Sequence, residues 1–208
     1  MISLFAGDEN MLSSQAKRVS SFCISIGVID EQDREKYDYC YEVMFATMLN
    51  VVPVMLIGLA TGFLAQTVCF MMVFALLKNT VGGYHANSHL ACFAGTICTF
   101  LIYRLIASVI PVGILPAVAA VFTVFAGITV SFLAPVGTEN KPLGKRQKNQ
   151  LKEDSRLLIL FLCIIVLFLL LQDISPQWAF SVSSAVAAVS VSLIAGKIKL
   201  SFADTFNS

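Results

Sequence analysis

The sequence has few charged residues, and its middle has almost none. Only 13% of the 208 residues are charged, about half of the roughly 25% found in soluble domains. Between Tyr41 and Pro135 the charged residues are Glu42, Lys78 and Arg104. Hydrophobic residues make up 57% of the chain, and the mean hydropathy is +0.81. This composition excludes a water-soluble globular domain and predicts an integral membrane protein.

The sequence also lacks a basic domain, a signal peptide and a CxxC pair, and each absence argues against a class of function or processing. The net charge is only +1, and no basic domain suggests nucleic-acid binding. Residues 1–10 lack a basic stretch followed by an apolar run, so no cleavable signal peptide is expected. No CxxC pair occurs, and Cys69, Cys98 and Cys163 lie within apolar runs. Free thiols in such surroundings pack as small hydrophobic groups, so these cysteines are expected to be unpaired.

Six apolar segments predict the transmembrane helices of an all-α integral membrane protein. A span needs about 20 residues to cross a hydrocarbon core of about 30 Å, and the second and fifth segments are short by this measure. Tight connections such as Ala60-Thr61-Gly62 predict antiparallel hairpins. The predicted spans are residues 41–59, 63–77, 90–110, 114–133, 157–171 and 178–195.

The N-terminal part of the chain differs from the rest. Between Met11 and Ile29, apolar residues recur near helical spacing, and Lys17 and Arg18 lie between them. This pattern is typical of an amphipathic helix in the membrane interface. A second helix with acidic residues in its first turn is expected from about Glu31 onward. The predicted domains are therefore N-terminal amphipathic cytoplasmic or interfacial helices (1–40), a six-span domain (41–200) and a short C-terminal tail (201–208).

The basic residues indicate the orientation. They cluster before the first predicted span, in the fourth connection and after the last span, whereas the first, third and fifth connections have none. The positive-inside rule therefore predicts that both termini and the connection at 78–89 are cytoplasmic. These basic residues are Lys17, Arg18, Arg34, Lys36, Lys141, Lys145, Arg146, Lys148, Lys152, Arg156, Lys197 and Lys199.

A short polar stretch holds the two histidines of the chain, His85 and His89, followed by Cys92. Titratable groups in a membrane protein are costly and usually functional. An imidazole can accept the proton of a thiol and so produce a nucleophilic thiolate. In a continuous helix, however, His85 and Cys92 would be about 10 Å apart, too far for a hydrogen bond of about 3 Å. Either the backbone between them bends, or His89 is the base.

Three interpretations of this stretch stay open on spacing alone. Cys92 and one histidine form a nucleophilic pair, or both histidines and Cys92 bind Zn²⁺, for which these ligand types are suitable. The zinc interpretation, which would make the protein a metal-dependent membrane protease, lacks a nearby carboxylate and an HExxH sequence. The third interpretation is a polar connection without chemistry. A different class of function is a small transporter or exporter of a peptide, in which the two histidines, Glu42 and Arg104 would line a path.

Several of these residues also carry a family resemblance. Gly82-Gly83-Tyr84-His85, with Cys92 seven residues beyond His85, resembles the accessory gene regulator B (AgrB) family, as does Asn140-Lys141-Pro142 before a fifth span. The resemblance covers the chain from about Gln32 onward. Members of that family are membrane-embedded cysteine endopeptidases of Gram-positive bacteria. They remove the C-terminal tail of a pro-peptide and help to form a cyclic thiolactone or lactone quorum-sensing signal.

The resemblance implies roles for five residues and no metal or organic cofactor. Cys92 would be the nucleophile and His85 the general base. Gly83 falls on the family's glycine two residues before that histidine, and Lys78 stands where the family often has arginine. We expect both to contact substrate, together with Lys141 in the basic loop.

The resemblance also implies partners and a location. The expected partner is a precursor peptide with an amphipathic N-terminal region and an acidic tail, with the lipid bilayer around the spans. A homodimer is a further expectation, and no nucleic acid is expected. The location implied is the cell membrane of a Gram-positive bacterium, as a multi-pass protein.

Overall fold

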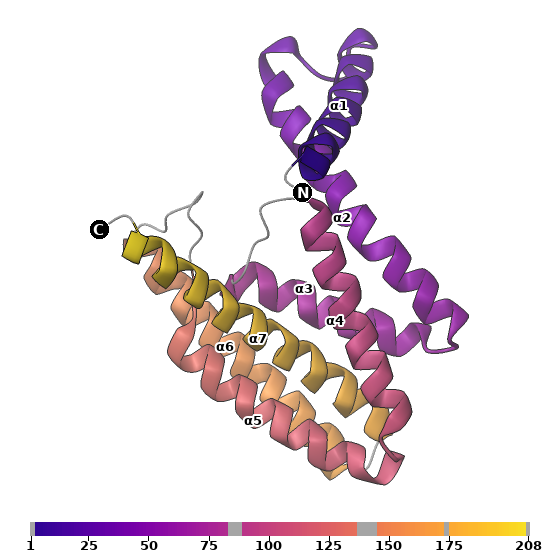
Figure 1. Ribbon diagram of the computed structural model, residues 1–208, viewed down its shortest axis with the longest axis vertical. Coiled ribbons are helices and arrows are strands. Elements are labelled where there is room, and N and C mark those ends of the chain that lie inside the picture. The colour runs from indigo at the N-terminus through magenta and orange to yellow at the C-terminus, as the bar shows by residue number, and fades with distance from the viewer. Residues whose placement is uncertain (1–2, 83–88, 137–144, 173–174, 207–208) are drawn as a thin grey trace. The chain divides into compact units, whose positions relative to one another are not determined.

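The structure is a computed structural model that describes residues 3–82, 89–136, 145–172 and 175–206 (Figure 1). Within these ranges the chain is helical, and its one β-bridge joins Gly82 to Val136. Among the described residues, six helical segments are long and apolar enough to cross a membrane. The predicted class, an all-α multi-pass membrane protein with about six spans, is therefore confirmed. The helices are α1 (Ser3–Ser25), η1 (Glu31–Asp33), α2 (Arg34–Ala60), α3 (Leu64–Val81), α4 (His89–Val109), η2 (Val112–Ile114), α5 (Leu115–Leu133), α6 (Lys145–Leu171) and α7 (Pro176–Phe206).

The helices extend beyond the apolar segments that predicted them. The fifth span was expected to begin at residue 157, whereas α6 begins at Lys145 and its apolar part runs from Asn149 to Leu171. Helix α3 has 18 residues, so neither segment is as short as expected. Helix α7 continues to Phe206, so residues 201–206, expected to be a tail, are helical. The difference has a physical reason, because a helix continues into the polar interface where hydropathy no longer marks it.

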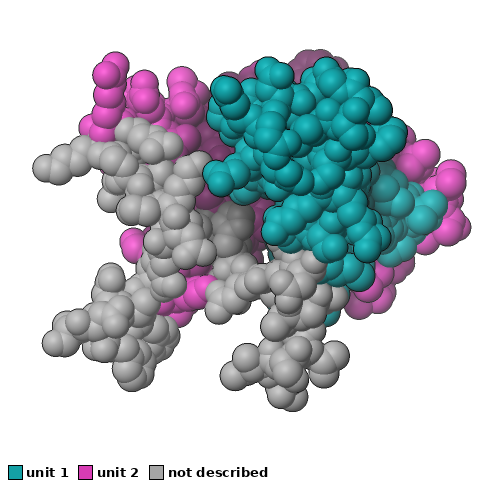
Figure 2. Space-filling view, turned by 90° about the horizontal axis from the view of Figure 1, so that it is seen from above, with its two compact units in different colours: residues 1–57, 86–98 teal, residues 58–85, 99–208 magenta. Residues whose placement is uncertain are grey.

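The chain forms two compact units, which Figure 2 distinguishes by colour. Unit 1 consists of Met1–Ile57 and Ala86–Cys98, and unit 2 consists of Gly58–His85 and Thr99–Ser208. Helices α2 and α4 contribute residues to both. The predicted division at residues 40 and 200 remains a prediction. Each unit is described by itself below.

Helix α7 is the central helix of unit 2. It packs against α3, α5 and α6. In its most apolar stretch, 72% of the residues are buried, whereas the corresponding share is 39% or less in every other span. Small buried residues such as Ala179 and Ala185 let neighbouring helices approach closely. The buried hydroxyls of Ser181 and Ser190 donate to carbonyls one turn earlier in the same helix. Unit 2 is thus arranged around a helix of small residues whose polar groups are largely satisfied internally.

An aromatic cluster fills the contact between α3, α4 and α7. The Tyr103 ring lies 4.6 Å from Phe70, 5.8 Å from Phe100 and 5.7 Å from Phe180, measured between ring centroids. The Tyr103 hydroxyl lies 2.7 Å from Ser181 Oγ. Because the Ser181 hydroxyl donates to Gln177 O, Tyr103 is the donor to Ser181. Aromatic packing and a buried hydrogen bond therefore fix α4 to α7.

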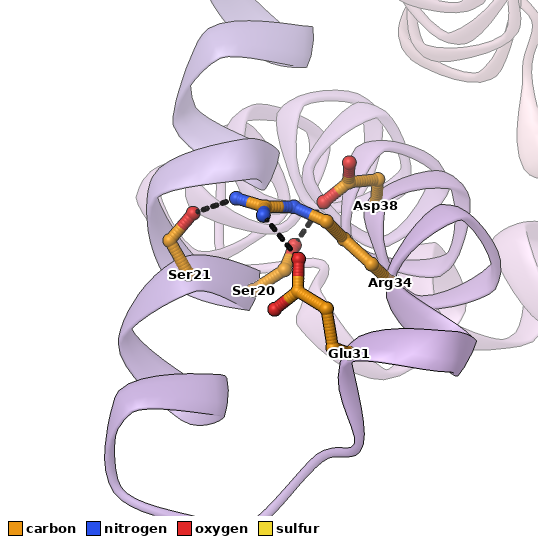
Figure 3. Close-up of polar contacts among 5 residues, drawn as sticks. All are labelled: Ser20, Ser21, Glu31, Arg34 and Asp38. Carbon is orange, nitrogen blue, oxygen red and sulfur yellow. Dashed lines mark hydrogen bonds and ion pairs between the residues drawn. The ribbon is translucent and has the colours of Figure 1, made fainter.

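In unit 1, polar contacts join α1 to the beginning of α2 (Figure 3). Arg34 donates to Glu31 at 2.7 Å and to Ser21 at 2.6 Å. The Ser20 hydroxyl contacts the Asp38 carboxylate and is fully buried. Helix α1 therefore packs one face against α2. The helix expected between residues 11 and 29 is part of α1, which begins earlier and ends at Ser25 before Gly27 (φ +74°).

Candidate functional site

The C-terminal end of α3 is held by the residues that follow α5. The Gly82 N–H donates to Lys78 O at 3.1 Å, and the Val136 N–H donates to Val81 O at 3.1 Å. Gly82 has φ +77°, a conformation in which side chains are strained. A Cβ at this position would also collide with the carbonyl oxygen of Val136. This turn therefore requires glycine, and it fixes where the chain leaves α3.

Helix α6 contributes a further contact to the same helix end. Ser155 is fully buried, and its Oγ lies 2.5 Å from Leu151 O in its own helix and 3.4 Å from Thr80 O in α3. Together with the Val81–Val136 hydrogen bond, this contact holds the last turn of α3 from two sides. The residues after Val81 thus follow a helix end that contacts from α6 and from Val136 hold in place. No motif in the sequence indicated Ser155 or Val136.

Lys78 occupies the last turn of α3 and is partly buried. Its Nζ lies 5.4 Å from the centroid of the Phe74 ring, and a cation at this end of a helix interacts favourably with the helix dipole. These contacts account for a lysine at this position without a ligand. Its role in binding substrate stays a prediction.

Cys92 is the fourth residue of α4, which begins at His89. Its side chain is partly buried, and its carbonyl oxygen accepts a hydrogen bond from Thr96 Oγ1 at 3.0 Å. The first turn of a helix favours a negatively charged group, because the helix dipole is positive there. A thiolate is the reactive form of cysteine. Cys92 therefore lies in the first turn of α4, and its role as the nucleophile stays a prediction.

Three of the predicted site residues, His85, Gly83 and Lys141, lie outside the described residues, as does the side chain of His89. The catalytic pair and the substrate contacts accordingly stay predictions. Among the side chains that are described, no three His, Cys, Asp or Glu groups lie close enough to hold a metal ion. Because that set omits both histidines, the zinc interpretation is not tested by this geometry. All six cysteines are unpaired.

The fold and the polar stretch define a multi-pass helical membrane protein with a thiol at the first turn of a span. The model of the accessory gene regulator B (AgrB) family matches residues 16–195. The chain belongs to the AgrB family, and it therefore has a role in the accessory gene regulator system of quorum sensing.

Two relatives from Clostridium perfringens carry AgrB-like names. The first, from strain SM101 / Type A, is 26% identical over 168 residues, which cover 77% of this chain and 78% of that protein. The second, AgrB-like protein 1 from strain 13 / Type A, is 23% identical over 143 residues, covering 67% of this chain and 75% of that protein. No solved structure matches the chain.

Proposed function

We propose that this protein is a membrane-embedded cysteine endopeptidase that removes the C-terminal tail of a quorum-sensing precursor peptide and promotes ring closure. The observation that carries the proposal is the position of Cys92 in the first turn of α4, within the region matched by the AgrB family. The same region contains the Gly-x-His stretch that ends at His85. Nucleophile and base then come from consecutive parts of the chain.

The ends of the two neighbouring helices are compatible with the pairing. Helix α3 ends at Val81 and α4 begins at His89, so neither helix contains both His85 and Cys92. One straight helix would hold the two groups about 10 Å apart. The bend that direct proton transfer requires is therefore compatible with the described helices. The Gly82 N–H is already bonded to Lys78 O, so an oxyanion would have to be bound by other donors, such as backbone N–H groups in the first turn of α4.

The proposed reaction has two steps. In the first, the Cys92 thiol transfers its proton to His85, and the thiolate attacks the scissile carbonyl carbon. The peptide C–N bond breaks as the imidazolium returns the proton to the leaving amine, and the remaining peptide is held as a thioester on Cys92. In the second, a thiol or hydroxyl of the same peptide attacks the thioester carbonyl. The ring closes and the Cys92 thiol is restored.

The fate of the thioester depends on which nucleophile reaches it. Attack by water would hydrolyse it and give a linear product, whereas attack by a thiol conserves the acyl activation as a thiolactone. We infer that Lys78, Gly83 and Lys141 contact the precursor, the two lysines by attracting its acidic tail. Exclusion of water and positioning of the substrate side chain would then favour cyclisation.

Cleavage of a co-expressed precursor peptide, followed by gel mobility and mass spectrometry, tests the proposal. Cys92→Ala should abolish cleavage, and Cys92→Ser should reduce it by at least about 100-fold, because a serine hydroxyl is a far weaker nucleophile at neutral pH. Cys98→Ala, on the same helix and exposed, is the matched control and should cleave normally. Normal processing by Cys92→Ala would refute the assignment.

The base and the metal alternative are tested separately. His85→Ala should lose cleavage, whereas His89→Ala should retain it if His85 is the base. Stoichiometric zinc in the purified protein, with activity lost to a chelator, would instead favour the metal interpretation.

A further inference from the structure

A small cavity lies at the end of unit 2 where α3, α5 and α7 begin and α4 ends. Its volume is about 40 Å³, and Phe63, Gln66, Tyr103, Arg104 and Gln177 line it. About 10–15 Å³ of such volume accommodates one water molecule. The cavity is therefore large enough for the oxygens of one phosphate group and too small for an organic ligand.

Arg104 contributes the charge of this cavity. Its guanidinium carbon lies 3.9 Å from the centroid of the Phe63 ring. Its Nε is buried and has no hydrogen-bond partner in the described part of the chain, where Arg104 also forms no ion pair. A buried guanidinium N–H without an acceptor is unfavourable, because the group has lost its hydrogen bonds to water. Among the described residues, the Arg104 Nε therefore lacks an acceptor, and Arg104 lines the cavity.

The helices around Arg104 add positive potential to the cavity. Gln66 lies in the first turn of α3 and Gln177 in the first turn of α7, and helix N-termini favour anions. The two side-chain amides are 3.5 Å apart, a long contact that leaves donor capacity for a ligand. No acidic residue is among the residues that line the cavity. Asp173, in the connection before α7, lies outside the described residues and is included in the test below.

We propose that this cavity binds the phosphate group of an anionic phospholipid. A guanidinium binds phosphate through two parallel N–H donors. Apolar residues such as Val112 and Leu115 also line the cavity, and Leu105, Val109 and Ile114 are exposed on the same segments, α4 and η2. These residues provide contacts for acyl chains, which free phosphate would not use. A zwitterionic headgroup would bring its ammonium group close to Arg104, so an anionic headgroup is favoured.

The experiment measures the thermal unfolding midpoint of the purified full-length protein in a neutral detergent. Phosphatidylglycerol, phosphatidylcholine with the same acyl chains, and inorganic phosphate are each titrated. Phosphatidylglycerol should raise the midpoint by about 5–10 °C at a concentration 100-fold above its Kd, and phosphatidylcholine by much less. Arg104→Gln should lose most of this shift, and Arg104→Lys, which keeps the charge and lacks the fork, should lose part of it.

Arg156→Gln is the matched control, because Arg156 is an exposed arginine at the other end of the bundle. It should keep the full response. An equal loss in Arg156→Gln would show that general surface charge produces the shift, and an equal response to inorganic phosphate would show that no lipid is required. Either result overturns the proposal. If Asp173→Asn gains a much larger response than the wild type, Asp173 is the natural partner of Arg104, and the proposal is likewise overturned.

Discussion

Tyr103 is the residue at which the polar and aromatic contacts of unit 2 meet. Its ring is stacked on Phe70 of α3 and Phe180 of α7, and its hydroxyl donates to Ser181, which in turn donates to Gln177 O. Such a chain of hydrogen bonds satisfies polar groups inside a membrane domain without water. Loss of one member therefore affects its neighbours.

Tyr103→Phe removes the hydroxyl and keeps the ring. We expect the free energy of unfolding to fall by about 1 kcal/mol, which lowers the thermal midpoint by about 2–4 °C in a protein of this size. Ser108→Ala is the control, since the Ser108 hydroxyl is exposed on the same helix and bonds only to Leu105 O among described partners. A double variant with Ser181→Ala should lose less than the sum of the two single variants. An unchanged midpoint in Tyr103→Phe would contradict this account.

The chemically distinctive residues could be identified from the sequence, but the residues that fix the adjacent end of α3 could not. His85 and Cys92 stand out because polar groups are rare in this chain. The requirement for glycine at Gly82 depends on Val136, and the fixation of Thr80 depends on Ser155. Both partners are distant in sequence, and their contacts arise only when the helices pack. The lack of an acceptor for the Arg104 Nε among the described residues likewise becomes apparent only when the helices that line the cavity are packed together.

Among the elements, the turn after α3 tolerates a side chain least, because of both its backbone conformation and its contact with Val136. Gly82→Ala would introduce a side chain at φ +77° and a collision with Val136 O. We expect a loss of about 2–4 kcal/mol in unfolding free energy, together with a strong loss of precursor cleavage. Both effects have one cause, because the chain would leave α3 in a different direction.

Gly62→Ala separates the effect of backbone strain from the effect of the collision with Val136. Gly62 has nearly the same φ, +73°, but nothing lies within 4 Å of its added Cβ. This variant should lose only about 1 kcal/mol, from backbone strain alone, and should keep cleavage activity. Thermal unfolding and the cleavage assay are read on both variants. Equal destabilisation of the two would show that the contact with Val136 contributes nothing.

The number of spans could be predicted from the sequence, whereas the helix ends and the inner helix could not. High hydropathy is typical of helices that face lipid. Helix α6 has the highest mean hydropathy of all spans, 2.6, and only 22% of the residues in its apolar stretch are buried. Helix α7 has a hydropathy of 1.8 and is the most buried. A helix surrounded by other helices needs small residues rather than strongly apolar ones, so the most apolar span was not the central one.

For the whole molecule, the basic residues predict one orientation, with both termini in the cytoplasm. Fusions to alkaline phosphatase, active only outside the cytoplasm, and to a green fluorescent protein, fluorescent only inside, test it. Phosphatase should be active after Gly62, Gly113 and Gln172, and fluorescence should appear after Arg146 and Ser208. Strong fluorescence after Gly113 would reverse the orientation and move the polar stretch at 78–92 to the outer side.

The burial of α7 also has a consequence for biosynthesis. Helix α7 is synthesised after α3, α5 and α6, yet all three pack on it. Until α7 has been inserted, these three helices therefore lack their common partner. Unit 2 therefore cannot complete its packing before α7 is inserted, and a chain truncated before Pro176 should be a substrate for membrane quality-control proteases rather than a partly active protein.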